Sequence, residues 1–376
     1  MRKQGNHVSS AQAELSPQPS FADVSLRDWT TSSADTVPDC WDELEPAPEL
    51  CRPGMTVPEG FVVVIQPPAP SCSVKKAPIN LVQLPHSPMD PDGYMWYNGL
   101  REVQFLSEKP FTKGTFGEVF RVWVPLPDGR VQSAALKLLQ PGASTFGFAN
   151  EVDTLKRMWG ASGSLQLLAA SAEFTYKGTR RPALLLEYCD GGSLANLMDI
   201  RARQLGIAHG SVLLFDEASL RLVMRQLLEA LHEVHEAQMI HLDLKPENLL
   251  FKGEQLKIAD FGCAVMRSRR TGHFETEGGG TLLYMAKEVT ASKRGVPTAH
   301  GVTEKADVFS AGCVLAEMAF LHDQPIEFYA FSRQMEYPLP DFVPPELLAY
   351  LRLLTDPDPR RRPSAAQALQ HEWLQQ

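Results

Sequence analysis

The prolines of this chain are unevenly distributed, and this constrains where a folded domain can lie. Fourteen of the 29 prolines fall within residues 1–95, where acidic residues outnumber basic ones 12 to 6. Proline lacks a backbone N–H and fixes φ, so it interrupts helices and central strands. The composition therefore predicts a disordered, Pro-rich, acidic tail over residues 1–95 and a folded domain over residues 96–376.

One dense apolar stretch, residues 61–65, interrupts this segment. It fits two interpretations: a strand that adds to the sheet edge of a docking partner, or a locally collapsed patch. The sequence leaves both open. A docking partner for the N-terminal tail is expected only under the first.

The overall composition excludes several classes of protein. Hydrophobic residues make up 44% and charged residues 22%, which is typical of a globular chain. The net charge of −9 and the lack of a long basic run argue against nucleic acid as a partner. The six cysteines form no CxxC pair, so we expect reduced thiols in an intracellular compartment, cytoplasmic or nuclear. No signal peptide and no membrane segment are expected, because no apolar stretch is long enough.

From about residue 94 the sequence pattern changes from short strands to long helices. The turn dipeptide Asp128-Gly129 separates the second and third predicted strands. After Asp216, a helix-capping residue, apolar residues recur at a spacing of 3.6. The strands are predicted at residues 105–106, 118–124, 133–139 and 183–188. A small sheet is therefore followed by a mainly helical region.

A glycine-rich loop and a lysine on an apolar strand suggest a phosphate site. Residues 113–120 read Lys-Gly-Thr-Phe-Gly-Glu-Val-Phe between two predicted strands, and such glycines let backbone N–H groups approach phosphates. Farther on, Lys137 lies on a predicted apolar strand, where a charge is costly without an anionic partner. Glu151, in the helical stretch 148–158, is the natural partner, and nearby Asp153 remains an alternative.

Residues 240–262 carry the most specific pattern in the chain. Within His-Leu-Asp-Leu-Lys-Pro-Glu-Asn and the later Asp-Phe-Gly, polar side chains alternate with core residues. Asp243, Lys245, Asn248 and Asp260 bring two carboxylates, an ammonium and an amide beside apolar strands. This set can hold a divalent metal, a phosphate and a hydroxyl nucleophile.

These motifs resemble those of the eukaryotic protein kinase family over about residues 100–376. The resemblance implies an α+β, bilobal protein kinase fold with a β-rich N-lobe at about residues 96–188 and a mainly helical C-lobe at about residues 189–376. ATP in the cleft between the lobes and Mg²⁺ are the implied cofactors, and proteins are the implied substrates. The implied nucleotide contacts are Gly114 and Gly117 over the phosphates, Val119 and Ala135 around the adenine, Lys137 on the α and β phosphates with Glu151 as its partner, and the backbone of Glu187 and Cys189 at the adenine edge.

By the same resemblance, Asp243 is the catalytic base or orients the substrate hydroxyl, and Lys245 stabilises the transferred phosphoryl group. Asn248 and Asp260 are the implied Mg²⁺ ligands. Thr281 resembles the threonine that contacts the catalytic aspartate in serine/threonine kinases, and Lys245 also favours Ser/Thr over Tyr specificity. The implied activity is transfer of the ATP γ-phosphate to protein Ser/Thr hydroxyls in intracellular signalling.

A second group of residues resembles the structural parts of the kinase large lobe. Glu288 and Arg362 match the ion pair that fixes the peptide platform. Three positions depart from the family pattern: Thr112 at the first loop glycine, Leu242 at the arginine before the catalytic aspartate, and Lys287 at the proline before Glu288. None removes a group that touches Mg²⁺ or the γ-phosphate. Because of Leu242, we expect activation that does not depend on that arginine gripping a phosphorylated loop.

The subfamily and the activity have competing interpretations. The residues around Asp243 are similar to those of myosin light-chain kinases and the Mos kinase. Residues 101–105, 191–194 and 260–265 instead resemble MAP kinase kinase kinases such as NF-kappa-B-inducing kinase, which we favour. The main alternative to an active kinase is a nucleotide-binding pseudokinase that serves as a scaffold. A small-molecule phosphotransferase is disfavoured, because the activation segment and the 288–362 pair serve peptide substrates.

Overall fold

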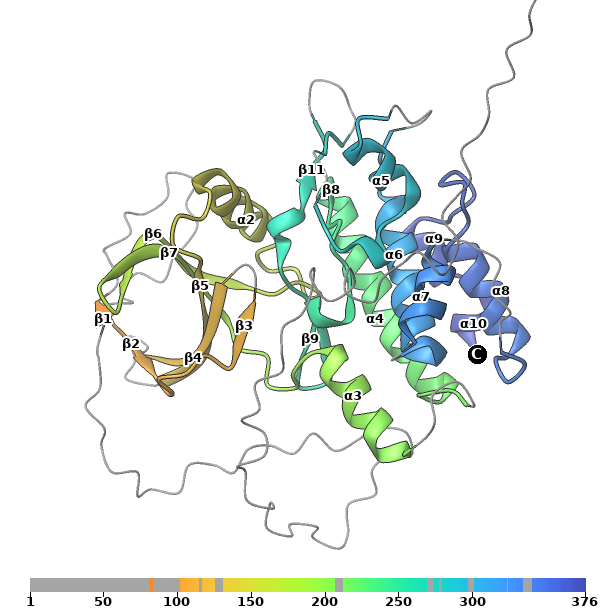
Figure 1. Ribbon diagram of the computed structural model, residues 1–376, viewed down its shortest axis with the longest axis horizontal. Helices are drawn as coiled ribbons and strands as arrows, with labels where there is room; N and C mark the ends of the chain where they lie inside the picture. The colour runs from red at the N-terminus through yellow and green to blue at the C-terminus, as the bar shows by residue number, and fades with distance from the viewer. Residues whose placement is uncertain are drawn as a thin grey trace, which may run out of the picture. The chain divides into compact units, whose positions relative to one another are not determined.

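The first half of the folded region is an antiparallel sheet, seen in a computed structural model of the chain (Figure 1). Residues 82–83, 102–114, 117–125, 131–206, 212–268, 274–276, 279–296, 301–322, 324–333 and 340–376 are the ones that the structure describes. Within them the sheet has the strand order β1-β2-β4-β5-β7-β6, and β3 pairs with β4. Its strands are β1 (Val82–Gln83), β2 (Glu102–Phe105), β3 (Thr112–Gly114), β4 (Gly117–Pro125), β5 (Val131–Leu139), β6 (Leu167–Tyr176) and β7 (Thr179–Glu187).

The second half is mainly helical, as the sequence predicts. Its α-helices are α3 (Leu194–Leu205), α4 (Glu217–Glu236), α5 (Lys287–Lys293), α6 (Lys305–Ala316), α7 (Pro325–Ser332), α8 (Pro345–Leu354), α9 (Ala365–Leu369) and α10 (Glu372–Gln375). Two small antiparallel pairs accompany them: β9 (Leu249–Lys252) with β10 (Gln255–Ile258), and β8 (Met239–Ile240) with β11 (Val265–Met266). The bilobal α+β division into a sheet-rich and a helical part is confirmed.

Local sequence signals fix where two of the helices, α2 (Thr145–Arg157) and α4, begin. α2 begins after Ser144, whose side chain accepts a hydrogen bond from the Gly147 N–H. α4 begins after Asp216, which accepts a bond from the Ser219 N–H, so the predicted cap is confirmed. Each cap satisfies a backbone donor that the first helical turn leaves unpaired, and such a cap stabilises a helix by about 1 kcal/mol.

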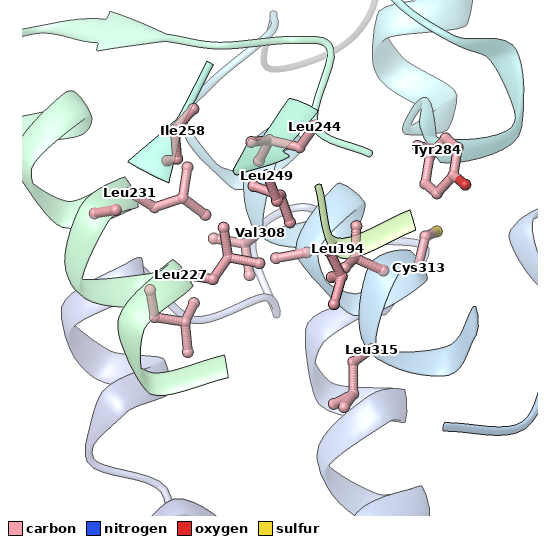
Figure 2. Close-up of a cluster of buried hydrophobic side chains, with 14 of the residues drawn as sticks. Leu194, Leu227, Leu231, Leu244, Leu249, Ile258, Tyr284, Val308, Cys313 and Leu315 are labelled. Carbon is pink, nitrogen blue, oxygen red and sulfur yellow. The ribbon is translucent and has the colours of Figure 1, made fainter. Parts of the chain in front are cut away.

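The larger hydrophobic core lies where α4, α6 and the β9–β10 pair meet (Figure 2). α4 contributes Leu227 and Leu231, and α6 contributes Val308 and Leu315, all of them fully buried. Ile258 of β10 packs into the same cluster. α6 is buried along almost its whole length, which lets it serve as a rigid base for the loops beside it.

A smaller core lies within the sheet. Val122, Leu136 and Leu185 are buried there, and Phe120 packs edge-on against Phe105 at 5.2 Å between ring centroids. On β4 and β5, Phe120 and Leu136 are next to Val119 and Lys137, which lie on the opposite face of the sheet. β4 and β5 contain the predicted strands 118–124 and 133–139 and extend each of them.

Some predictions fall wholly or partly outside the described residues. The turn at Asp128-Gly129 and the apolar stretch 61–65 lie outside them. Of residues 1–95, the structure describes only β1, whose Val82 pairs with Val103 of β2. The remainder of the tail prediction stays a prediction.

Candidate active site

Lys137 lies at the centre of the site, on β5 in the middle of the sheet. Its Nζ is 2.7 Å from Oε1 of Glu151 on α2 and 2.8 Å from Oδ1 of Asp260, and its side chain is only 12% exposed. The predicted pairing with Glu151 is therefore confirmed, whereas Asp153 is exposed on the same helix. Burial alone would lower the pKa of Lys137, but the carboxylates of Asp260 and Glu151 outweigh it and hold that pKa above its usual value. The ammonium thus links three separate elements.

Asp260 has an unusual backbone that directs its carboxylate. It adopts a left-handed conformation with φ of 60°, just before the short 3₁₀ turn Phe261–Cys263. Aspartate tolerates this conformation better than most residues, and the buried Phe261 that follows packs against His241 at 4.9 Å between ring centroids. Burial would raise the pKa of Asp260, but the nearby Lys137 ammonium lowers it below the usual value, so the carboxylate stays ionised.

Asp243 is a buried carboxylate held by several donors. Its Oδ1 accepts hydrogen bonds of 2.8 Å from both the backbone N–H and the hydroxyl of Thr281. Asn248 Nδ2 donates to the Asp243 carbonyl at 2.8 Å and to Oδ2 at 3.2 Å. Lys245 Nζ lies 3.9 Å from Oδ2. The expected contact between Thr281 and Asp243 is confirmed, and the four residues form one cluster.

The backbone beneath Asp243 is held by a residue whose role the sequence analysis missed. Asp307 of α6 is fully buried and accepts bonds from the N–H groups of His241 at 2.8 Å and Leu242 at 2.9 Å. His235 Nε2 lies 3.0 Å from the same carboxylate. Leu242 has φ of 65°, a conformation that these bonds stabilise. The sequence did carry a signal for this role, because Asp307 is an acidic residue at the start of a helix that is otherwise mostly apolar.

The glycine-rich stretch includes the end of β3 and the start of β4. Gly114 pairs with Gly117 at the end of this ladder, and the two residues between them lie outside the described part of the chain. Gly117 has φ of 152°, and a Cβ there would overlap the Leu138 carbonyl, so no other residue fits without a shift. Thr112, where the family has glycine, lies in β3 opposite Val119 with ordinary strand backbone, so it causes no φ strain.

The remaining nucleotide candidates lie on the same face of the sheet as Lys137 or at the end of β7. Val119 pairs directly with Lys137, and Ala135 is two residues before it on β5, so all three share one face. Glu187 ends β7, and Cys189 follows in the segment that leads to α3. Burial raises the pKa of the Cys189 thiol to about 12.

The two candidate metal ligands carry oxygen atoms suited to Mg²⁺. The described hydrogen bonds engage Oδ1 of Asp260 and Nδ2 of Asn248, which leaves the second carboxylate oxygen and the amide oxygen as ligand atoms. Among the described residues, no group of three or more His, Cys, Asp or Glu side chains is arranged for a metal. Mg²⁺ typically takes only one or two protein ligands and completes its shell with water and phosphate, so the pair fits this ion.

The ion pair expected in the helical half of the domain is also present. Arg362 forms two bonds with Glu288, of 2.6 and 3.1 Å, and both residues are buried, so the predicted pair is confirmed. Lys287, which departs from the family pattern, is the exposed first residue of α5.

Within the described ranges, no helix combines the length and apolar character needed to cross a membrane.

Comparison with known proteins agrees with this geometry. The chain is 32% identical over 201 residues to the serine/threonine-protein kinase cds1 of Schizosaccharomyces pombe, which covers 51% of this chain and 41% of that protein. It is 33% identical over 199 residues to the MAP3K epsilon protein kinase 2 of Arabidopsis thaliana, covering 51% and 13%. The chain thus spans less than half the length of these curated relatives. A model of the protein kinase domain matches residues 108–374, and the chain belongs to the protein kinase family.

Proposed function

We propose that this chain is an active serine/threonine protein kinase that transfers the γ-phosphate of ATP to Ser or Thr hydroxyls of proteins. The observation that carries the proposal is the position of Lys137, which contacts Glu151 and Asp260 at once. A buried ammonium fixed between a helix and Asp260, the proposed Mg²⁺ ligand, would receive the phosphates of a nucleotide.

The nucleotide contacts follow from the elements around Lys137. Its ammonium would bind the α and β phosphates, and the backbone N–H groups of Gly114 and Gly117 would cover the phosphate chain. Val119 and Ala135 share the Lys137 face of the sheet, where they would enclose the adenine. The backbone of residues 187 and 189 would bind its polar edge.

The chemical step would use the cluster around Asp243. Asn248 and Asp260 would hold Mg²⁺, which neutralises phosphate charge during transfer. Asp243, oriented by Thr281 and Asn248, would position the substrate hydroxyl and accept its proton. Lys245 would stabilise negative charge on the transferred group. Most of the rate gain would then come from positioning and charge stabilisation.

The specificity for Ser and Thr in proteins rests on further residues. Thr281 bonded to Asp243, together with Lys245, matches the serine/threonine pattern. The buried pair of Glu288 and Arg362 supports the segment on which a peptide would lie. Protein substrates, a role in intracellular signalling and a docking partner for the N-terminal tail belong to this proposal.

The test is phosphate transfer from γ-labelled ATP with Mg²⁺, to the chain itself and to a generic basic protein. The wild type should yield phosphoserine or phosphothreonine, and Lys137→Met and Glu151→Gln should lose at least about 100-fold in rate. Asp153→Asn is the matched control for Glu151→Gln, because it removes an exposed carboxylate from the same helix and should leave the rate unchanged.

The scaffold alternative makes a different prediction in the same assay. A pseudokinase would bind nucleotide but transfer no phosphate under any metal condition. This outcome would mean that Thr112, Leu242 and Lys287 matter more than their positions indicate, and it would replace the kinase proposal.

A further inference from the structure

Residues 187–193, which join β7 to α3 and which we call the connecting segment, are anchored to the β9–β10 hairpin. In the second half of the segment, the Gly191 N–H donates to the Phe251 carbonyl at 2.8 Å, and Asp190 Oδ1 accepts from the Gly253 N–H at 2.8 Å. A Cβ on Gly191 would lie 2.7 Å from the Phe251 Cβ, so the connecting segment and the hairpin are in close contact. The hairpin therefore fixes the end of the segment next to α3.

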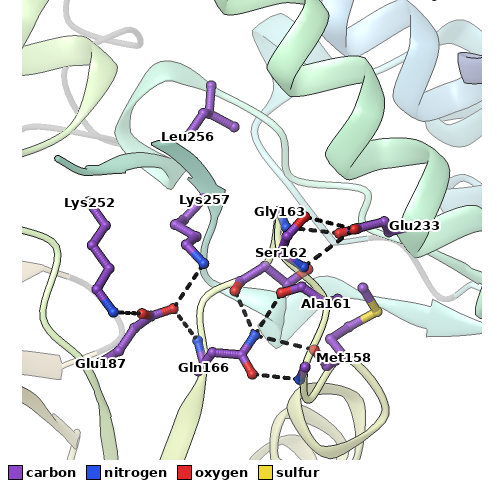
Figure 3. A network of polar contacts seen from close by, with 12 residues as sticks. Met158, Ala161, Ser162, Gly163, Gln166, Glu187, Glu233, Lys252, Leu256 and Lys257 are labelled. Carbon is purple, nitrogen blue, oxygen red and sulfur yellow. Dashed lines mark hydrogen bonds and ion pairs between the residues drawn. The ribbon is translucent and has the colours of Figure 1, made fainter. Parts of the chain in front are cut away.

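The other end of the connecting segment is fixed by the buried carboxylate of Glu187 (Figure 3). Its Oε2 accepts a bond of 2.6 Å from Lys252 Nζ at the end of β9. Its Oε1 accepts from the Gln166 N–H at 2.9 Å and lies 3.5 Å from Lys257 Nζ on β10. The hydrogen bond to Glu187 raises the pKa of Lys252 above its usual value. One carboxylate thus connects β7 to both strands of the hairpin.

The pair formed by Glu187 and Lys257 is more costly to bury than an apolar pair. Their side chains are only 5% and 7% exposed. A buried ion pair of this kind contributes little net stability, because loss of hydration offsets the attraction between the charges. It does, however, favour one geometry strongly, since displacing either partner leaves a buried charge unpaired. This points to a role in positioning rather than in stability.

Gln166 extends the network to the end of α2, the helix that carries Glu151. Its side-chain amide donates to the Met158 carbonyl at 3.3 Å and the Ala161 carbonyl at 3.0 Å, and it accepts from the Gly160 N–H at 2.8 Å (Figure 3). Gln166 thus holds the loop after α2 through its side chain and holds the end of β7 through its backbone.

The same loop is also bound from α4. Glu233 accepts bonds from the Ser162 hydroxyl at 2.9 Å and the Gly163 N–H at 2.8 Å. Ile258, next to Lys257, exchanges backbone bonds with Gly163 and Leu165, of 2.8 and 2.9 Å. The loop and the hairpin therefore form a common support on which Glu187 is placed.

We propose that Glu187, through its ion pair with Lys257, is a positioning residue for the nucleotide. The inference rests on the proposed function, in which the backbone of residues 187 and 189 contacts the adenine. Only Tyr188 and Cys189 lie between the two anchored ends, so the anchors determine where this backbone lies. The carboxylate itself points to the hairpin lysines and acts on the nucleotide through the backbone.

The test measures nucleotide affinity and catalytic constants on the full chain. Lys257→Met keeps the apolar stem and removes the charge, and Glu187→Gln keeps the shape of the acid. Both should raise the dissociation constant of MgADP and the KM for ATP by about fivefold to tenfold, with kcat changed by less than about twofold. Combining the two substitutions should add little to either alone, because the pair acts as a unit.

Two further variants make the result decisive. Lys252→Met alters the half-exposed partner, so it should fold even if Lys257→Met does not, and it should raise the MgADP dissociation constant by about twofold to threefold. Arg221→Gln is the control: it breaks a partly buried pair with Glu217, of 2.8 Å, within α4 and should leave nucleotide affinity unchanged.

The outcomes separate this inference from the proposed function. If the wild type binds MgADP and the Glu187 and Lys252 variants bind it equally well, even with lower thermal stability, Glu187 has only a structural role and the inference is wrong. If the wild type binds no nucleotide, the proposed function fails and the inference fails with it. A rise in KM and dissociation constant in these variants, and not in Arg221→Gln, supports the inference.

Discussion

Removing Glu288 should be more damaging than removing both members of its ion pair. Arg362 is fully buried at the guanidinium and makes four hydrogen bonds, two of them to Glu288. The other two go to the carbonyls of Asp356 at 2.7 Å and Lys305 at 3.0 Å. Its guanidinium also lies 4.9 Å from the ring centroid of Phe309. The pair therefore joins α5, α6 and the chain before α9.

The magnitudes follow from these contacts. Glu288→Leu leaves a buried guanidinium without its counter-charge, which should lower the free energy of unfolding by about 3–5 kcal/mol. The double variant Glu288→Leu with Arg362→Met removes both charges and leaves two carbonyls unpaired, at about 1 kcal/mol each. We therefore expect a loss of about 2 kcal/mol in the double variant, smaller than in the single one.

The assay is urea denaturation of the full chain, monitored by tryptophan fluorescence. It is carried out on the wild type, both single variants and the double variant. The expected pattern is strong non-additivity, with the double variant more stable than Glu288→Leu. A loss below about 1 kcal/mol for Glu288→Leu, or effects that simply add, would show that the charges are solvated and would refute the reasoning.

Two other substitutions or treatments test the site more locally. Gly280 has φ of 90°, and a Cβ there would overlap the Leu242 carbonyl, so Gly280→Ala should slow phosphate transfer by at least about tenfold. Gly295→Ala is the control, because Gly295 has φ of 67° but open space around it, and this variant should not slow transfer. Equal rates for the two variants would contradict this prediction. Because burial raises the pKa of Cys189 to about 12, its thiolate should be about 1 in 10⁴ of the total at pH 8. The rate of Cys189 alkylation, measured by peptide mass analysis, should be far slower than that of a free thiol and should rise about tenfold per pH unit between pH 7 and 9. A rate equal to that of free cysteine would contradict the burial of this thiol.

The parts of the fold that the sequence predicts are those with strong local signals. The strands around Val119 and Lys137 carry short runs of apolar residues, and Asp216 caps a helix with a regular apolar face. The need of Lys137 for an anionic partner was predictable as well, because a charge on a buried strand is costly without one. The sequence left Glu151 and Asp153 open as that partner, and the structure pairs Lys137 with Glu151.

The strand β6 was missed because its local pattern is weak. After two leucines, Leu167–Tyr176 runs through the small residues 169–172. Its pairing with β7 is interrupted between Leu167 and Ala169 and between Ser171 and Phe174. Each irregularity shifts the alternation of side chains between the two faces, so the period of two is lost. Only the pairing with β7, which depends on the tertiary structure, defines this strand.

The network around Glu187 was missed for a related reason. Lys257 lies between Leu256 and Ile258 in a buried strand, which is the same signal that identified Lys137. The sequence therefore indicated that Lys257 needs an acidic partner. It could not indicate that the partner is Glu187, 70 residues earlier, because the meeting of β7 and β10 depends on the packing of the whole domain.

The central claim is that the cluster around Asp243 transfers phosphate. The most direct measurement is the rate of transfer from γ-labelled ATP at saturating MgATP, with wild type and Asp243→Asn compared side by side and with nucleotide binding measured on the same samples. We predict measurable transfer by the wild type, a loss of at least about 1,000-fold in Asp243→Asn, and similar nucleotide affinity in both. Equal transfer by the two proteins, or binding without transfer by the wild type, would contradict the account.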